Sequence, residues 1–242
     1  MLAVMELSAA MAENIPQSAG GAGEEINLIS LVKGFSRIFW GLVLTAVLLL
    51  SQTRIEFLTS VRLPAFFAGT ALHFWGVATL WRAGLIGPRW RGRLLLAGLL
   101  VLLEIYFFPF ALWWKAMPYV LYFACNVGVL ILSVIASLFV CNMIAADVFR
   151  SFSLKGECLE AQIYGVAVVF FMALPLLVAV VSSMIAALRY ETVFCDELIG
   201  LIYRVPVWLY IIVMIPFSLT LATLWKARDR SYQRFCLTKK TK

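Results

Sequence analysis

Apolar residues fall into six long runs along the chain, each interrupted by only a few polar residues. The runs cover residues 29–50, 64–81, 94–114, 119–142, 161–188 and 205–225. About 20 mostly apolar residues in a helix cross the hydrocarbon core of a bilayer. Because backbone groups in lipid need internal partners and the runs do not alternate strictly, helices are favoured over strands. The pattern predicts an all-α integral membrane protein, with a bundle of six transmembrane helices within residues 27–226.

Composition agrees with this prediction and excludes several other classes of protein. The 242 residues are 63% hydrophobic and 14% charged, whereas soluble domains average about 45–50% apolar and about 25% charged residues. A chain of this length leaves much of its surface facing solvent, so one water-soluble core cannot hide the excess. A soluble enzyme, a disordered protein and a disulfide-stapled secreted module are therefore excluded.

The basic residues are distributed unevenly between the two sides of the predicted spans. With a cytoplasmic N-terminus, fifteen of the 20 Lys and Arg residues lie on the cytoplasmic side. This positive-inside bias predicts that both termini are cytoplasmic, and we expect the bacterial cytoplasmic (inner) membrane. Residues 1–26 are expected to form a flexible cytoplasmic segment and residues 227–242 a basic cytoplasmic tail. The net charge of +7 then indicates orientation and attraction to anionic headgroups, not nucleic-acid binding.

The first run begins with an amphipathic stretch over residues 29–40. Lys33 and Arg37 share one helical face, while Leu31, Phe35 and Phe39 are expected to face lipid. One interpretation is an interfacial helix that lies on the membrane. The other, which we favour, is the inner end of one long tilted helix with snorkelling basic side chains. The fourth run also continues past its predicted span, as far as residue 150, which predicts a helix of about 48 Å over residues 119–150.

The loop over residues 81–93 is the densest basic segment between two runs. It contains Arg82, Arg89, Arg91 and Arg93, with Trp81 and Trp90 expected to anchor its ends at the membrane interface. A loop of this kind docks a cytoplasmic partner or binds anionic headgroups. The simpler interpretation, which we favour, is a loop that only sets orientation.

Glu104 and His73 are the two residues that the requirement for crossing lipid does not explain. Glu104 lies in the middle of the third run, where an ionised carboxylate costs about 2.5–3.5 kcal/mol or more. His73, the only histidine, lies in the middle of the second run. Both are at similar depth on neighbouring antiparallel helices, so we predict a contact between them. It would be a proton-responsive pair or one wall of a substrate path; the alternative is a hydrogen bond that only fixes packing.

The fourth run carries a polar stripe. Asn126, Ser133 and Ser137 follow at spacings of seven and four residues, which places them on one helical face, and Cys141 continues the stripe. We name the first three as the polar face of the fourth span.

Small residues recur in the fifth run, where Ala179, Ser183 and Ala187 are spaced by four. This interval is typical of close helix packing. The triplet Phe-Trp-Gly occurs at residues 39–41 and again at residues 74–76. A three-residue match is too short to establish a repeat, and we interpret it as chance.

Several kinds of chemistry lack the residues that they need. One histidine cannot supply a two-histidine zinc site or a b-type haem, and the five cysteines include no CxxC pair. There is no P-loop, and no GxSxG elbow stands out. We therefore expect no metal, no cofactor and no catalytic residue, and we favour a protein that is not an enzyme.

Three functions remain. The first is a transport component, because the layout resembles the permease subunits of small ABC-type exporters, which work with a separate ATPase; the resemblance is one of topology and length. The second is a non-catalytic structural or assembly subunit of a larger membrane complex. The third is a lipid-modifying enzyme that uses Glu104 and His73. The expected partners are the lipid bilayer with anionic headgroups and other protein subunits, such as an ATPase or further copies of the chain.

Overall fold

The computed structural model describes residues 27–50, 57–84, 89–117, 119–190, 195, 197–198 and 207–240. Of this described part, 93% is helical and none is strand. The elements are α2 (Leu28–Leu50), α3 (Phe57–Trp81), α4 (Trp90–Ala116), α5 (Leu121–Ser151), α6 (Lys155–Val168), the π-helical turn η2 (Val169–Ala173), α7 (Leu174–Tyr190) and α9 (Val207–Lys240). Since α6, η2 and α7 follow one another without a break, these form six long helical segments, the number that the sequence predicts.

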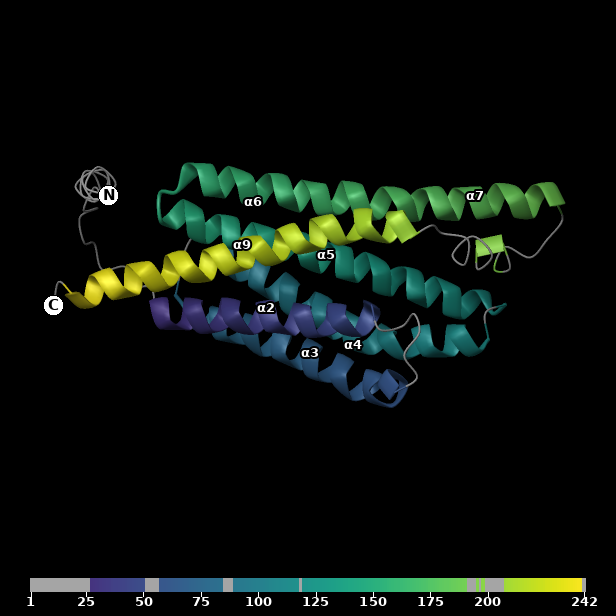
Figure 1. The fold of residues 1–242 in the computed structure, drawn as a ribbon, viewed down its shortest axis with the longest axis horizontal. Helices are drawn as coiled ribbons and strands as arrows, with labels where there is room; N and C mark the ends of the chain where they lie inside the picture. The colour runs from purple at the N-terminus through teal and green to yellow at the C-terminus, as the bar shows by residue number, and fades with distance from the viewer. Residues whose placement is uncertain are drawn as a thin grey trace.

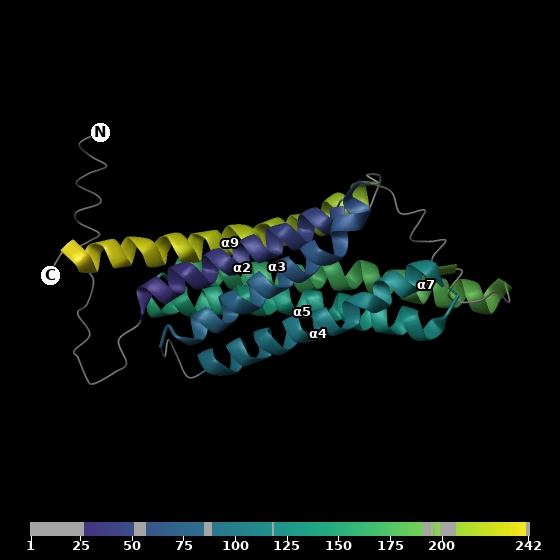
Figure 2. The same cartoon turned by 90° about the horizontal axis from the view of Figure 1, so that it is seen from below.

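The six segments run back and forth along one axis and form an elongated bundle (Figures 1 and 2). The start of α2, the α3–α4 junction, the α5–α6 turn and the end of α9 lie together at one end of this bundle (Figure 1). We call this the basic end, and it comprises residues 27–37, 79–84, 89–93, 147–160 and 226–240. The basic loops that the sequence assigns to one side of the membrane are therefore close in space.

Four of the segments are long and apolar enough to cross a membrane. They are residues Leu28–Ala46, Trp90–Trp114, Leu121–Ser151 and Lys155–Arg189. Many large apolar side chains also point outward, for example Leu95 at 64% and Leu188 at 75% exposure, which is far more apolar surface than a soluble monomer presents. These features support a multi-pass membrane protein; for α3 and α9 the predicted crossing stays a prediction.

Helices α2 and α3 pack backbone to backbone through four glycines. Gly34 faces Gly76 and Gly41 faces Gly69, so the pairs repeat every seven residues along an antiparallel seam. A Cβ atom built on Gly41 would lie 2.7 Å from the Gly69 carbonyl oxygen and 2.8 Å from the His73 nitrogen. No side chain fits there. Each copy of the Phe-Trp-Gly triplet contributes its glycine, Gly41 or Gly76, to this seam.

Helix α5 lies at the centre of the bundle and packs against α4, α6, η2 and α9. Its last three turns are almost wholly buried, with Ile144, Ala146, Val148 and Phe149 at 1% exposure or less. This burial explains why the apolar pattern continues to residue 150. The predicted helical extension of the fourth span is confirmed, because α5 ends at Ser151.

The predicted orientation of the first helix is wrong in part. Leu31 and Phe35 are fully buried in the main core instead of facing lipid, and Phe39 packs against the ring of Trp225 at 5.2 Å. Because core and lipid both accept apolar side chains, amphipathicity alone does not separate the two faces. The helix is continuous from Leu28 to Leu50, as the favoured interpretation predicts.

Two other predictions differ from the structure near the basic end. Trp90 is not an interfacial anchor, since it is 1% exposed and packs into the core at the start of α4, whereas Trp81 is 45% exposed. The predicted boundary between the bundle and a tail at residue 227 lies inside α9, which continues to Lys240. Ala227 and Ser231, in the predicted tail, are fully buried, because α9 also packs against α2 and α6.

The fifth predicted span corresponds to α6, η2 and α7. The π-helical turn ends just before Pro175, which lacks a backbone N–H and so breaks the regular ladder of hydrogen bonds. Beyond this turn, no other described helix packs closely along α7. Ser183 is 2% exposed, but Ala179 and Ala187 are half-buried. The predicted close packing of this small-residue face is therefore not seen between the described helices.

Candidate functional site

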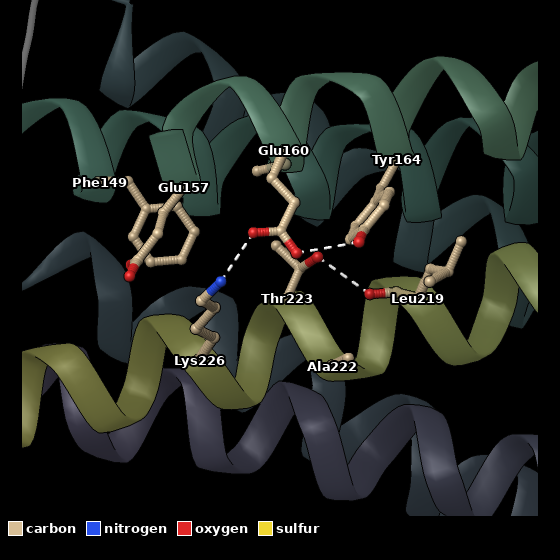
Figure 3. A pocket seen from close by; sticks show the side chains of 9 residues that line it. Phe149, Glu157, Glu160, Tyr164, Leu219, Ala222, Thr223 and Lys226 are labelled. Atoms are coloured by element: carbon tan, nitrogen blue, oxygen red, sulfur yellow. Dashed lines mark hydrogen bonds and ion pairs between the residues drawn. The ribbon is translucent and has the colours of Figure 1, made fainter. Parts of the chain in front are cut away.

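A small pocket of about 70 Å³ opens between α5, α6 and α9 at the basic end. Its polar wall is already paired: Lys226 Nζ lies 2.7 Å from Glu160 Oε2, and the Tyr164 hydroxyl donates to Glu160 Oε1 at 2.9 Å (Figure 3). Thr223 contributes a hydroxyl that donates to the Leu219 carbonyl. Both partners of the Lys226–Glu160 pair are more than one third exposed, so the pair joins α6 to α9 with a modest energy.

A second group of ions ties α4 to α5 near the end of α5. Arg93 Nη1 lies 2.6 Å from Asp147 Oδ1 and also donates to the Met143 carbonyl at 3.0 Å. Arg150 approaches the same carboxylate oxygen at 3.4 Å. The side chain of Asp147 is 9% exposed and that of Arg93 22%. Arg93 is therefore a structural partner of Asp147, and its predicted contact with a partner or headgroup stays a prediction.

The other three arginines of the predicted loop remain at the surface. Arg82, Arg89 and Arg91 are all exposed. They surround the α3–α4 junction at the basic end, so this part of the predicted partner or headgroup surface stays a prediction.

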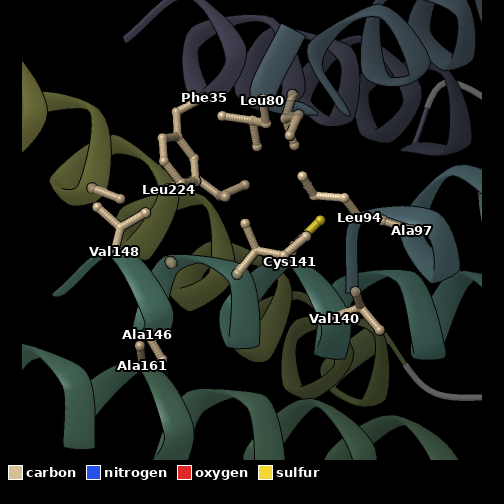
Figure 4. Packing of buried hydrophobic residues seen from close by; sticks show 14 of the residues in the cluster. Phe35, Leu80, Leu94, Ala97, Val140, Cys141, Ala146, Val148, Ala161 and Leu224 are labelled. Carbon is tan, nitrogen blue, oxygen red and sulfur yellow. The ribbon is translucent and has the colours of Figure 1, made fainter. Parts of the chain in front are cut away.

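The predicted polar pair lies deep in the bundle. His73 on α3 is 2% exposed and Glu104 on α4 is 5% exposed. Both face α5, which supplies Ser137 and Cys141, each 1% exposed. Figure 4 shows Cys141 pointing from α5 towards the part of α4 that carries Leu94 and Ala97. Three helices thus bring these four polar or polarisable side chains into one buried group, which we call the polar centre: His73, Glu104, Ser137 and Cys141.

Contacts within the polar centre pass through α5. The Cys141 sulfur lies 3.7 Å from His73 Nε2. Glu104 is close enough to interact electrostatically with the Cys141 thiol, and the Ser137 hydroxyl lies beside the Glu104 carboxyl, in a geometry that falls short of a hydrogen bond. Among the described residues no hydrogen bond or ion pair joins His73 to Glu104 directly. Both side chains lie close to Cys141, which agrees with the predicted similar depth, and the predicted contact between His73 and Glu104 stays a prediction.

The glycine seam between α2 and α3 contacts the polar centre at the backbone of His73. Gly41 of α2 lies against the backbone nitrogen and Cα of His73, at 2.8 and 3.1 Å from where its Cβ atom would be. This contact fixes the backbone of His73 on the side opposite to Cys141. The position of the histidine ring therefore depends on two interfaces, one with α2 and one with α5.

The predicted polar face of the fourth span is divided by depth. Ser133 and Ser137 are buried at 5% and 1% exposure, and Ser133 donates its hydroxyl proton to the Leu130 carbonyl. Asn126 is only half-buried, and its amide donates to the Tyr122 carbonyl within the same helix. Only Ser137 belongs to the polar centre, because Ser133 and Asn126 lie about one and three turns further along α5.

Two further polar residues of α5, Asn142 and Asp147, are buried and were not predicted as site residues. Asn142 is fully buried, donates to Thr220 of α9 at 2.8 Å, and leaves its side-chain oxygen without a protein partner. Asp147 is the acceptor of the Arg93 pair. The sequence held a signal for both, because Asn142 and Asp147 are polar residues within the fourth apolar run and its continuation. They are as exceptional there as Glu104 is in the third run.

No group of three or more metal-ligating side chains is close enough to hold a metal ion in the part of the chain that the structure describes. No known protein family, no curated protein and no solved structure matches the chain.

Proposed function

We propose that the chain is a transport component, a permease-like subunit that works with a separate cytoplasmic partner, and that the polar centre is its proton-responsive element. The observation that carries this proposal is the carboxyl of Glu104. It is buried in the middle of an apolar helix and has no basic partner among the described residues. An acid without a basic partner at this depth is costly, so its presence favours a role in protonation.

The surroundings of Glu104 support a protonation change linked to motion. His73, Ser137 and Cys141 come from two other helices, so a change of charge on Glu104 alters the forces between α3, α4 and α5. The seam at Gly41 transmits a shift of His73 to α2, since the two backbones touch. Coupling of this kind needs an element with two arrangements, and the contact between α2 and α3 is the element that we propose.

The basic end supports the second half of the proposal, a cytoplasmic partner. Arg82, Arg89 and Arg91 are exposed there, and α9 projects beyond the other helices (Figure 2). The segment at residues 150–160 is held against α9 by the Arg230–Glu157 pair, 2.6 Å between Nη2 and Oε1. A partner that docks on the α5–α6 turn would therefore contact α9 as well.

Protonation of Glu104 is tested by infrared difference spectra of the purified full-length protein between acidic and alkaline pH. The protonated carboxyl of Glu104 should give a C=O stretching band that Glu104→Gln removes. The matched control is Glu160→Gln, which removes an acid that is exposed and paired with Lys226, and this variant should keep the band. If Glu104→Gln leaves the band unchanged, the proton-responsive role is wrong.

The transport role is tested by purification of the full chain from native membranes and identification of the proteins that remain bound. Copurification with an ATPase, lost when the three exposed arginines at the α3–α4 junction are replaced by Gln, supports a permease. A set of membrane chains without an ATPase overturns it.

A structural or assembly subunit is the second candidate, and α7 favours it. The helix exposes large apolar side chains such as Leu177, Met184 and Ile185, at 57–59% exposure, and no other described helix covers it. In an assembly subunit another membrane chain would cover this surface. Cross-linking from Ile185→Cys to other membrane proteins, together with full tolerance of Glu104→Gln, would favour this candidate over transport.

A further inference from the structure

The outward face of α2 and α3 near the basic end gathers three basic side chains. Lys33 and Arg37 lie one turn apart on α2, and Arg82 follows the end of α3. The two helices are unusually close here, since a Cβ atom built on Gly76 would lie 2.9 Å from the Gly34 carbonyl oxygen. The backbone N–H of Asn27 also donates to the Ala83 carbonyl at 2.9 Å. These contacts bring the basic residues of α2 and the end of α3 to the same end of this helix pair.

Arg37 is held in a defined position on this surface. Its guanidinium carbon lies 3.9 Å from the centroid of the Trp75 ring, and its Nη1 donates to the Thr79 hydroxyl. No carboxylate pairs with it in the described part of the chain. The Arg37 guanidinium is stacked on a ring and fixed by one hydrogen bond, so it has little conformational freedom left to lose on binding an anion. Its remaining N–H groups can donate to that anion.

The direction of the Arg37 side chain agrees with a position near the lipid headgroups. A Cβ atom built on Gly76 would lie 2.8 Å from the Ile38 nitrogen, so the backbone of Arg37 is near the level of Gly76. The guanidinium reaches Thr79, three residues, or about 4.5 Å of helix, closer to the basic end. A side chain that reaches from an apolar part of a helix towards its end is snorkelling, so the charge lies closer to the basic end than the backbone of Arg37 does.

Exposed tryptophans surround the basic side chains. Trp75 is 59% exposed, Trp40 53% and Trp81 45%. Indole rings at a membrane interface lie at the level of the headgroups and pack against glycerol and the first methylene groups. An acidic protein segment would need neither this apolar rim nor this depth, so the combination of cations and tryptophans favours a lipid.

We propose that this face binds the phosphate group of an anionic phospholipid in the leaflet at the basic end. Arg37 donates to the phosphodiester oxygens, Lys33 and Arg82 add positive charge, and Trp75 packs against the glycerol region. The site depends on insertion of the protein into a membrane and is independent of the role of Glu104 and His73.

Native mass spectrometry of the full-length protein in mild detergent tests the site, with phosphatidylglycerol and phosphatidylcholine as the two probes. The parent protein should retain phosphatidylglycerol preferentially. Because hydrogen bonds to charged groups are among the stronger ones, Arg37→Gln should reduce this preference about tenfold or more. Arg37→Lys, which keeps the charge and loses the planar fork, should give an intermediate value. The control Lys239→Gln removes one positive charge from the far end of α9 and should behave like the parent.

Several results would overturn the lipid site. One is equal preference in the parent and in Arg37→Gln; another is an equal loss in Lys239→Gln, which would indicate a general charge effect. Displacement of the lipid by millimolar inorganic phosphate would indicate a site for free phosphate, and a lipid-free dimer held by this face would indicate a second copy of the chain. If Arg37→Gln does not fold, Thr79→Val serves instead, since it removes only the hydroxyl that fixes Arg37 and should weaken the preference severalfold.

Discussion

Replacement of Gly41 by alanine adds one methyl group at the closest approach of two helix backbones. The new Cβ atom would lie 2.7 Å from the Gly69 carbonyl oxygen, 2.8 Å from the His73 nitrogen and 3.1 Å from the His73 Cα. Ordinary van der Waals contact begins near 3.4 Å, so α2 and α3 must separate by about 0.7 Å at this point. All three obstructing atoms belong to backbone, and no rotamer change relieves the contact.

The expected change in the free energy of unfolding is the difference between two opposing effects. Overpacking of a well-packed interface costs about 1–3 kcal/mol. Alanine has a higher helix propensity than glycine, which offsets up to about 1 kcal/mol of this cost. We therefore expect Gly41→Ala to lower the free energy of unfolding by about 1–2 kcal/mol. Gly34→Ala should cost less, because its nearest obstruction is the end of the Leu80 side chain.

Stability is measured by titration with SDS in mixed micelles, with the loss of helix monitored by circular dichroism. Gly98→Ala is the matched control in α4, since its Cβ atom would meet only the Phe74 ring at 3.8 Å; this variant should be neutral or slightly more stable. A second readout concerns the polar centre. Displacement of His73 should increase the rate at which a membrane-permeant thiol reagent modifies Cys141, which is 1% exposed in the parent, as measured by peptide mass spectrometry.

Unfolding of Gly41→Ala at the same SDS concentration as Gly98→Ala would contradict the expected clash between the α2 and α3 backbones. A second result, in which Gly41→Ala loses stability while the modification rate of Cys141 stays at the parent value, would contradict the positioning of His73 by the seam. The seam would then hold the two helices together without positioning the polar centre.

Three further predictions concern the basic end and the core. Asp147→Ala leaves the half-buried Arg93 without its carboxylate and should lower the free energy of unfolding by about 2–3 kcal/mol in the SDS titration. Ser153→Gly should raise it by about 1 kcal/mol, because Ser153 has a φ of 60° in the α5–α6 turn, a region that favours glycine. A double-mutant cycle of Asn142→Ala and Thr220→Val should give a coupling energy of about 0.6–1.7 kcal/mol for their hydrogen bond.

Controls for these predictions are available in the same chain. Asp229→Ala removes an exposed acid of α9 and should change the unfolding free energy by less than about 0.5 kcal/mol; an equal loss for both aspartates would contradict the role given to the Arg93 pair. Ser153→Val should be destabilising, and an increase in stability would argue against backbone strain in the turn. A coupling energy of zero would mean that Asn142 and Thr220 are adjacent without contributing jointly to stability.

The hydrophobic pattern was sufficient for the helices and for the depth of the unusual residues. A helix that crosses lipid must be long and apolar, so the number of segments, the extension of α5 and the similar depth of His73 and Glu104 can be read from residue order alone. The bias in Lys and Arg likewise predicted that the basic loops lie at one end, since the loops of antiparallel helices alternate between two sides.

Faces and partners could not be read in the same way. In lipid an apolar side chain is equally acceptable towards the core and towards the membrane, so Leu31 and Phe35 were assigned to the wrong face and Trp90 to the wrong environment. Nothing in the sequence around Arg93 predicted its ion pair with Asp147, which lies more than fifty residues away. These assignments depend on the rotation of each helix about its own axis, which neighbouring helices determine.

The order of residues was enough to predict an all-helical chain of six long segments and to single out Glu104 and His73. That both lie close to Cys141, that four glycines join α2 to α3, and that Arg37 stacks on Trp75 became visible only in the assembled bundle. The difference arises because length and hydropathy are local properties of the chain. Contacts between helices require close approach of backbones and a definite rotation of each helix, and these arise only when all the segments pack together.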